Sequence, residues 1–225
     1  MILAALGREA DTLFPDMALV PLRQGDVVTE YDGPVTHAYF PVSGVLSLVT
    51  PLQDGTEVEA CLIGRNGMTG AAALHDSGRS FTRDICQVPG EALRTSLESL
   101  RQACEASPKM RDLVGAQAVH LFAFASQSVA CNARHLLEPR LARWLLTCCD
   151  AAESDTIPMT QEFVAIMLGV QRSSLAASAG ELRRRGLIET GRGRVSLVDR
   201  AGLEGLACEC YRITRERTRR LLGPD

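Results

Sequence analysis

Residues 161–188, QEFVAIMLGVQRSSLAASAGELRRRGLI, constrain the fold of this chain more than any other stretch. Apolar Val164 and Leu168 recur at helical spacing before Gly169, and Leu175 follows where a second helix would pack against the first. Glycine reaches a positive φ at little cost, so Gly169 has a backbone reason to separate two short helices. The spacing predicts a helix-turn-helix; the alternative is a pair of amphipathic helices with no role in DNA binding.

The segment that follows predicts a β-hairpin beside the helix pair. Gly186 is placed to end the second helix, and LIETGRGRVSLVD then has the pattern of strand, glycine-containing turn and strand. Arg192 and Arg194 at the hairpin tip would extend the positive charge of the run RRR at 183–185. These features predict a winged helix-turn-helix, whereas an ordinary surface hairpin is the plainer alternative.

Charge is distributed unevenly along the chain. Residues 171–225 contain twelve arginines and seven acidic residues, a net charge of +5, while residues 1–170 carry a net charge of −8. Binding to nucleic acid depends on local potential, so the overall charge of −3 does not argue against it. The asymmetry favours a DNA contact in the C-terminal part, although a solvated charged surface would have the same composition.

Composition bounds the class of protein. With 225 residues, 46% of them hydrophobic, the chain can bury one or two cores. No apolar run approaches the roughly twenty residues of a membrane span. The N-terminal MILAALGREAD lacks the basic region and cleavage site of an export signal. We therefore expect a soluble, cytoplasmic protein of two domains, with no membrane partner.

The cysteines and histidines predict no metal site. Eight cysteines lie at 61, 86, 104, 131, 148, 149, 208 and 210, with no C-x-x-C pair. Cysteines scattered in this way are usually small core residues. The pairs Cys148–Cys149 and Cys208/Cys210 could be redox-active or bind metal, but neither has metal-site spacing with histidines nearby. His37, His120 and His135 are isolated in the sequence and are expected to be structural or exposed.

The N-terminal half has the pattern of a short helix over residues 1–16 followed by many short strands. Turn sequences recur about every ten residues from Leu19 to Leu93, which predicts a β-barrel or β-roll. Asp54-Gly55 is a hairpin turn signal. The apolar positions around Gly44 predict a buried strand pair that contains Tyr39, Val42, Val45, Leu46, Leu48 and Val49.

A long helix is predicted over residues 109–135, which contain no proline and one glycine. Steps of four and three residues define a heptad-like face on it, and such a face requires a partner helix. We expect that partner to be a second copy of the chain; packing on the chain's own β domain is the alternative. Pro139 then opens a further helix, with a hinge near 134–138. The predicted dimer interface consists of Met110, Val114, Gln117, Leu121, Phe124, Ser128 and Cys131.

A β-roll, a long helix and a winged helix-turn-helix in this order resemble the Crp/Fnr family of bacterial transcription regulators. The resemblance covers nearly all of residues 15–222 and rests on CNARHLLEPRLARWLL, AYFPVSGVLSLVTPLQDG and the helix-turn-helix itself. The tail RAGLEGLACECYRITRERTRRLL is similar to a subgroup with one extra C-terminal helix. The resemblance implies an α+β fold with a β-roll sensor at 1–107, a dimerisation helix and hinge at 108–137, and a DNA-binding domain at 138–225.

The resemblance also implies how the protein works: a homodimer whose second helix-turn-helix helices read a pseudo-palindromic operator, with RNA polymerase among its partners. Arg172 is the residue expected to recognise guanine. Family members with a glutamate after this arginine differ from this chain, so its operator should differ too. The predicted DNA contacts are Thr160, Gln161, Gln171, Arg172, Ser173, Ser174, Arg192 and Arg194.

The family's nucleotide-binding cassette falls on Gly67 to Ser80. Cyclic-nucleotide-binding members hold the ribose with a Gly-Glu pair and the cyclic phosphate with an Arg-Ser pair. This chain has Gly67-Met68 and Arg79-Ser80 at these places, with Ser126 where the long helix reaches the base. Methionine offers no adequate acceptor for a ribose hydroxyl, so cyclic AMP is a poor fit.

Several alternatives remain open for the roll. A cyclic dinucleotide, a small metabolite and no ligand at all are each compatible with the sequence; in the last case the roll is a scaffold. An iron–sulfur member would need an N-terminal cysteine cluster, but the first cysteine is Cys61, and a haem has only His75 as a candidate ligand. A pocket lined by Arg79, Ser80 and Ser126 would favour sensing. The competing class is an enzyme or a nucleotide-sensing module that does not bind DNA. No catalytic motif is visible, so an enzyme is not expected.

Overall fold

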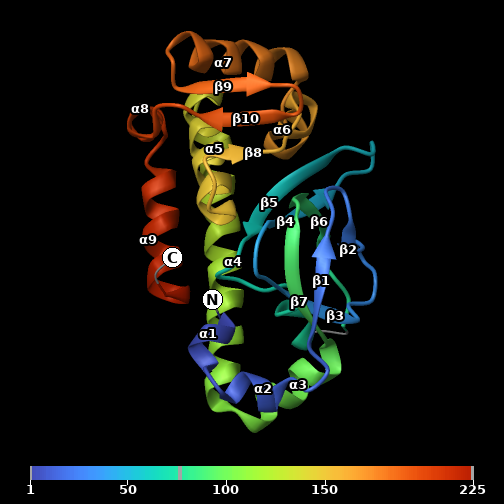
Figure 1. Cartoon of the computed structure of the whole chain (residues 1–225). Coiled ribbons are helices and arrows are strands. Elements are labelled where there is room, and N and C mark those ends of the chain that lie inside the picture. The colour runs from blue at the N-terminus through green and yellow to red at the C-terminus, as the bar shows by residue number, and fades with distance from the viewer. Residues whose placement is uncertain (1, 76–77, 224–225) are drawn as a thin grey trace.

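The computed structural model describes residues 2–75 and 78–223 (Figure 1). It begins with two five-residue helices, α1 (Ile2–Leu6) and α2 (Glu9–Leu13). The prediction of one helix over residues 1–16 is therefore wrong for the described part. Gly7 adopts a φ of +61° between the two helices, and this left-handed residue interrupts the helical hydrogen bonds.

Two antiparallel sheets form the predicted β-roll. One has the order β1 (Ala18–Leu22), β7 (Gly90–Ser96), β3 (His37–Pro41). The other has the order β2 (Val27–Thr29), β6 (Arg83–Val88), β4 (Val45–Pro51), β5 (Glu57–Ile63). A short 3-10 helix, η1 (Ala72–Leu74), lies in the long connection between β5 and β6. The prediction of a mixed fold with an N-terminal β domain is confirmed.

Gly44 joins the two sheets of the roll. β3 pairs with β7, while β4 pairs with β5 and β6, so the predicted strand pair around Gly44 is wrong. Gly44 has a φ of +78°, and a Cβ there would lie 2.5 Å from the carbonyl oxygen of Val88. The glycine therefore permits a sharp passage from one sheet to the other, which alternation of apolar residues cannot distinguish from a hairpin. The predicted Asp54-Gly55 turn does join the hairpin β4–β5, with Gly55 at a φ of +82°.

Three helices connect the roll to the C-terminal domain. α3 (Leu97–Ala106) precedes α4 (Pro108–Arg134), and the hydroxyl of Ser107 caps α4 by accepting from the Met110 amide at 3.3 Å. α5 (Leu137–Ala152) starts two residues before the predicted Pro139. Only His135 and Leu136 separate α4 from α5, so the connection is shorter than the predicted hinge.

The C-terminal part is a winged helix-turn-helix with additional helices. Its order is β8 (Thr156–Ile157), α6 (Gln161–Leu168), α7 (Arg172–Arg184), β9 (Ile188–Gly191), β10 (Arg194–Leu197), α8 (Arg200–Leu206) and α9 (Cys210–Leu222). The strands form a sheet in the order β8-β10-β9. Gly169 has a φ of +62° between α6 and α7, and Gly186 has a φ of +69° after α7. Both predicted glycine turns are confirmed.

The long helix α4 lies between the roll and α9, and the helix-turn-helix lies at one end of the molecule (Figure 1). One hydrophobic core is shared by the roll and the C-terminal domain. Hydrogen bonds also join the two parts: the Trp144 indole donates to Glu59 at 2.8 Å, and the Gln24 amide donates to the Pro158 carbonyl at 2.6 Å. The C-terminal domain is therefore docked on the roll, with α6 against β5.

Candidate nucleic-acid interface and ligand site

The first turn of α7 is exposed, as the sequence predicts. Gln171 is the N-terminal flanking residue of α7, and the next three residues, Arg172, Ser173 and Ser174, are all exposed. The following Leu175 is 1% exposed and packs into the core. Burial of one face of α7 thus fixes the helix while its N-terminal turn stays open to a ligand such as duplex DNA.

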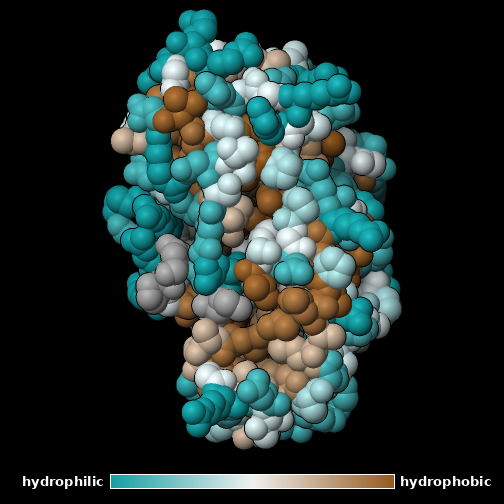
Figure 2. Space-filling view, viewed as in Figure 1, coloured by the Kyte–Doolittle hydropathy of each residue, from teal (hydrophilic) through white to brown (hydrophobic). Residues whose placement is uncertain are grey.

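The predicted phosphate contacts lie in the same domain. Thr160 is exposed and caps α6 by accepting from the Phe163 amide at 3.2 Å, and Gln161 begins that helix. The β9–β10 hairpin, the wing, carries exposed Arg192 and Arg194. This end of the molecule displays mostly hydrophilic side chains, whereas apolar side chains gather near α1 and the lower end of the roll (Figure 2). The structure therefore gathers all eight predicted DNA contacts in one domain.

The arginines of this domain differ in how they are engaged. In residues 2–75 and 78–223, the guanidinium groups of Arg172, Arg192 and Arg194 make no ion pair or hydrogen bond. By contrast, Arg183 donates to Thr190 at 3.3 Å and Arg184 pairs with Glu181. Arginines without a protein partner are the ones whose charge is available to phosphates and base edges.

The predicted dimer interface on α4 is wrong. Met110, Gln117 and Cys131 are fully buried inside the single chain, and the others, apart from half-buried Leu121, are nearly so. Their face packs on the roll, on the N-terminal helices and on α9, so it cannot also meet a second copy. These residues instead pack on the chain's own domain, which was the alternative prediction. The residues concerned are Met110, Val114, Gln117, Leu121, Phe124, Ser128 and Cys131.

A different face of α4 is exposed and apolar. Val119, Phe122 and Val129 are 54%, 76% and 70% exposed, and Ser126 and Ala133 are exposed between and beyond them. These five residues, the exposed stripe, follow steps of three, four, three and four, which is the repeat of a coiled-coil face. By length and composition alone, α4 is also apolar enough to cross a membrane, a test that core helices of soluble proteins pass as well. The heptad-like face predicted from the sequence is the other apolar face of α4, so the exposed stripe was not predicted.

The predicted cassette residues do not converge on one site. Met68 is fully buried in the apolar core, and Gly67 lies beside Gln117 of α4. Arg79 pairs with Asp32 at 2.8 Å on the surface, and the Ser80 hydroxyl donates to the Thr82 carbonyl at 2.7 Å. Ser126 belongs to the exposed stripe of α4. The part of the cassette at 76–77 lies outside the described residues.

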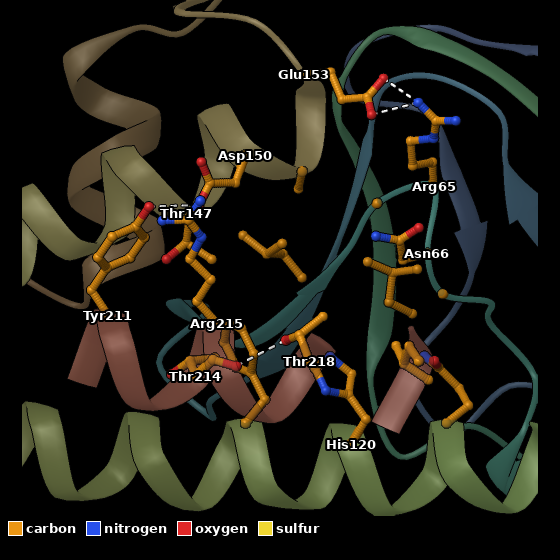
Figure 3. A pocket seen from close by; sticks show the side chains of 18 residues that line it. Arg65, Asn66, His120, Thr147, Asp150, Glu153, Tyr211, Thr214, Arg215 and Thr218 are labelled. Atoms are coloured by element: carbon orange, nitrogen blue, oxygen red, sulfur yellow. Dashed lines mark hydrogen bonds and ion pairs between the residues drawn. The ribbon is translucent and has the colours of Figure 1, made fainter. Parts of the chain in front are cut away.

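A small pocket lies where the roll, α4, α5 and α9 meet (Figure 3). Its volume is about 90 Å³, and Gln117 and His120 of α4 line it together with Asp150, Tyr211 and Arg215. The Tyr211 hydroxyl donates to Asp150 at 2.8 Å, so two of these polar groups already satisfy each other. Such a volume holds a few water molecules, while pockets for drug-sized ligands measure about 300–1,000 Å³.

Two polar groups on the α4 side of this pocket are notable. Burial lowers the pKa of His120 to about 4, so its imidazole is neutral at physiological pH. The Gln117 amide nitrogen donates to the Met68 carbonyl at 3.1 Å, but its oxygen has no hydrogen-bond partner among the described residues. An unsatisfied buried acceptor is consistent with a water molecule in the pocket.

Two carboxyl groups are buried in the roll. Burial raises the pKa of Glu59 to about 7, although hydrogen bonds from Ser47 and Trp144 oppose the shift. Burial also raises the pKa of Asp84 to about 7, against a hydrogen bond from Thr82. Glu59 lies where β5 meets α5, so its ionisation bears on the contact between the roll and the DNA-binding domain.

The β-roll, the long helix and the exposed first turn of a winged helix-turn-helix define a DNA-binding transcription regulator with a sensor-type domain. Family models that match the N-terminal and the C-terminal domain support this class of protein. The model for the cyclic nucleotide-binding domain matches residues 19–107, and the model for the Crp-like helix-turn-helix domain matches residues 139–206. The chain belongs to the Crp/Fnr family of transcription regulators.

Solved structures with the same fold include three regulators. A Crp/Fnr-family regulator from Eubacterium rectale is 16% identical, with a TM-score of 0.71 over 90% of this chain and 95% of that chain. FixK2 from Bradyrhizobium japonicum is 17% identical, with a TM-score of 0.72 over 85% and 98%. The c-di-GMP-responsive global regulator CLP from Xanthomonas campestris is 18% identical, with a TM-score of 0.69 over 85% and 98%. No curated protein sequence matches this chain.

Proposed function

We propose that this regulator binds a pseudo-palindromic operator as a homodimer and that the first turn of α7 reads its bases. The observation that carries the proposal is the exposed Arg172 at the start of α7, with a guanidinium group that has no partner in the described part of the chain. Arginine at this place in a recognition helix is suited to bidentate contact with guanine. Arg192 and Arg194 of the wing supply phosphate contacts, which position the protein without reading sequence.

The dimer forms through the exposed stripe of α4. Apolar residues at heptad spacing become buried when two copies of the helix, related by a twofold axis, pack against each other. The C-terminal end of α4 leads through His135 and Leu136 directly into α5, against which the helix-turn-helix packs. A twofold axis along α4 therefore sets the separation of the two α7 helices.

The division into a roll at 1–107, a dimerisation helix at 108–137 and a DNA-binding domain at 138–225 is part of the proposal. We also propose that the protein acts in the cytoplasm, where operator DNA is accessible, and that RNA polymerase is its partner at promoters. No membrane takes part, because the apolar surface of α4 is covered by the roll on one face and by the second copy on the other.

Within the proposal, the roll is a scaffold rather than a cyclic AMP receptor. Met68 is fully buried where the family's ribose acceptor stands, and Arg79 is already paired with Asp32. The second candidate function is a response to a cyclic dinucleotide. This candidate is favoured by the exposure of the ion pair between Arg79 and Asp32, in which the Arg79 side chain is 50% exposed. A ligand phosphate can replace an exposed carboxylate as the partner of an arginine.

Selection of bound duplexes from a random library tests the proposal. The purified protein is incubated without ligand, with cyclic AMP and with a panel of cyclic dinucleotides. Enrichment of a palindrome without ligand supports the scaffold, and enrichment that requires one cyclic dinucleotide supports the second candidate. Absence of enrichment in every condition would contradict sequence-specific DNA binding.

A further inference from the structure

Four side chains that bind metals well meet at the junction of α4 and α9. Cys131 and His135 belong to the last turn of α4 and its end, Cys208 to the connection between α8 and α9, and Cys210 begins α9. Their donor atoms all lie within 4.8 Å of one another. The three cysteines form a small buried cluster of their own, separate from the two larger cores. The spacing along the sequence gives no sign of this cluster, because His135 and Cys210 are 75 positions apart.

The distances fit one tetrahedral ion. Cys131 Sγ and Cys208 Sγ are 3.5 Å apart, and Cys210 Sγ is 3.7 Å from His135 Nδ1. In a tetrahedral zinc site with Zn–S bonds of about 2.3 Å, the sulfur atoms lie about 3.8 Å apart. Cys131, Cys208 and Cys210 form no disulfide bond, so three thiolates and the His135 imidazole can serve as ligands. Three cysteines and one histidine are a common ligand set of structural zinc.

The surroundings orient the donors as those of a metal site. His135 turns Nδ1 toward the sulfur atoms, while its Nε2 lies 3.2 Å from a Glu209 carboxylate oxygen. A carboxylate on the outer nitrogen of a metal-bound histidine fixes the tautomer and the ring. The Gln127 amide donates to Cys210 Sγ at 3.1 Å, which supports a thiolate. Arg143 is 4% exposed and its Nε has no partner among the described residues. Its charge would offset the net negative charge of three thiolates around a divalent cation.

We propose that Cys131, His135, Cys208 and Cys210 bind one Zn²⁺ ion that fastens α9 to the end of α4. Binding forms three Zn–S bonds and one Zn–N bond, and the three thiol protons pass to the solvent. Neither family model covers these positions, because the matches end at 107, resume at 139 and end again at 206. The site thus lies outside both matched domains, with two ligands at the end of α4 and two beside the start of α9, and it does not depend on the proposed DNA binding.

Metal content of the full-length protein tests the site. Wild type purified under reducing conditions and dialysed against metal-free buffer should retain roughly one zinc ion per chain by mass spectrometry of elements. Replacement by Co²⁺ should give the strong visible bands and thiolate charge transfer of a tetrahedral site. Cys208→Ser should lose both properties. Cys104→Ser should keep both, because Cys104 lies on α3 outside the cluster. Wild type without zinc, or with a Cys131–Cys208 disulfide by intact mass, would overturn the proposal.

Two further measurements remain decisive if Cys208→Ser folds poorly. Glu209→Gln keeps all four ligands and should weaken zinc binding about 10–100-fold in competition with a chromophoric chelator. A chelator should also lower the Tm of wild type and of Cys104→Ser, since zinc binds the folded state preferentially. Unchanged affinity in Glu209→Gln would refute the carboxylate–histidine arrangement, and an unchanged Tm with a strong chelator would refute a structural ion.

Discussion

Arg172 is the residue whose replacement should change DNA recognition most selectively. Its guanidinium group is free at the start of α7, and it makes no contact that stabilises the fold among the described residues. Arg172→Ala should weaken operator binding by about 1–3 kcal/mol and relax the preference at one base pair per half-site. Titration of the selected operator and of a random duplex by fluorescence anisotropy measures both effects.

Arg192→Ala on the wing is the matched control for this change. Its loss should weaken binding to the operator and to random duplex by similar factors and reduce the salt dependence of both, because a phosphate contact carries no sequence information. If Arg172→Ala behaved in the same way as Arg192→Ala, the base-reading role of Arg172 would be wrong.

Glu59 should make stability depend on pH. Its pKa is about 7 in the folded protein against an ordinary value of 4.5, so the unfolded chain loses this proton first as pH rises. The stabilising effect of the protonated group is complete below pH 4.5 and is lost as pH approaches 7. Glu59→Gln removes this dependence. Relative to wild type, its free energy of unfolding should rise by roughly 3 kcal/mol from pH 4 to pH 8 in urea titrations.

Glu91→Gln, at an exposed position of β7, serves as the control for Glu59→Gln. This side chain stays solvated on folding, so its substitution shows the effect of replacing a glutamate that is not buried. A difference between Glu59→Gln and wild type that is constant with pH would show that Glu59 titrates alike in the folded and unfolded chain.

At the scale of elements, two glycines of the helix-turn-helix should respond in opposite directions to alanine. Gly169 has a φ of +62°, and a Cβ there would lie 3.3 Å from a Val58 methyl carbon. Gly169→Ala should destabilise the protein by about 1–2 kcal/mol through backbone strain. Gly180 lies inside α7 with open space at its Cβ, so Gly180→Ala should stabilise by roughly 0.5–1 kcal/mol. Urea titrations check both; equal effects would contradict the turn.

The exposed stripe of α4 should control the oligomeric state. Phe122 is 76% exposed in the single chain, and a charge there would be buried without a partner in the dimer. Phe122→Glu should therefore shift the protein from dimer to monomer in sedimentation equilibrium. Phe81→Glu is the control, since Phe81 is 62% exposed in the connection between β5 and β6 and does not belong to the exposed stripe. A dimeric Phe122→Glu would mean that another surface joins the copies.

The helix-turn-helix could be predicted from sequence because its signals are local. Gly169 and Gly186 mark turns within a few residues of the helices that they end, and both have the positive φ that the sequence analysis required. The face of α4 could not be chosen in this way. Apolar residues recur at three- and four-residue steps on two of its faces, and periodicity does not say which face meets the chain's own domain.

The cysteine cluster and the Arg79–Asp32 pair could not be predicted from the sequence, because their members lie far apart along the chain. Cys131 and Cys208 are 77 residues apart, so their contact follows from the packing of α9 on α4 and not from any local motif. A Cys-x-x-x-His step on one helix turn, as in Cys131 and His135, was a visible signal. The engagement of Arg79 with Asp32 also depends on the tertiary fold, because the residues lie 47 positions apart.

At the scale of the whole molecule, the proposed homodimer places two α7 helices on one face of the duplex at a separation fixed by α4. The two half-sites should then lie one helical turn, about 34 Å or 10 base pairs, apart from centre to centre, or a multiple of that distance. The docked arrangement of roll, α5 and helix-turn-helix in each copy supports a rigid separation.

The most direct test measures affinity for the selected operator after insertions between its half-sites. An insertion of about 5 base pairs rotates one half-site by half a turn to the opposite face of the duplex. This insertion should lower the affinity of wild type to that of an isolated half-site, and Phe122→Glu should bind both operators at the half-site level. Equal affinity of wild type for the original and the inserted operator would show that the two α7 helices are not held at a fixed separation.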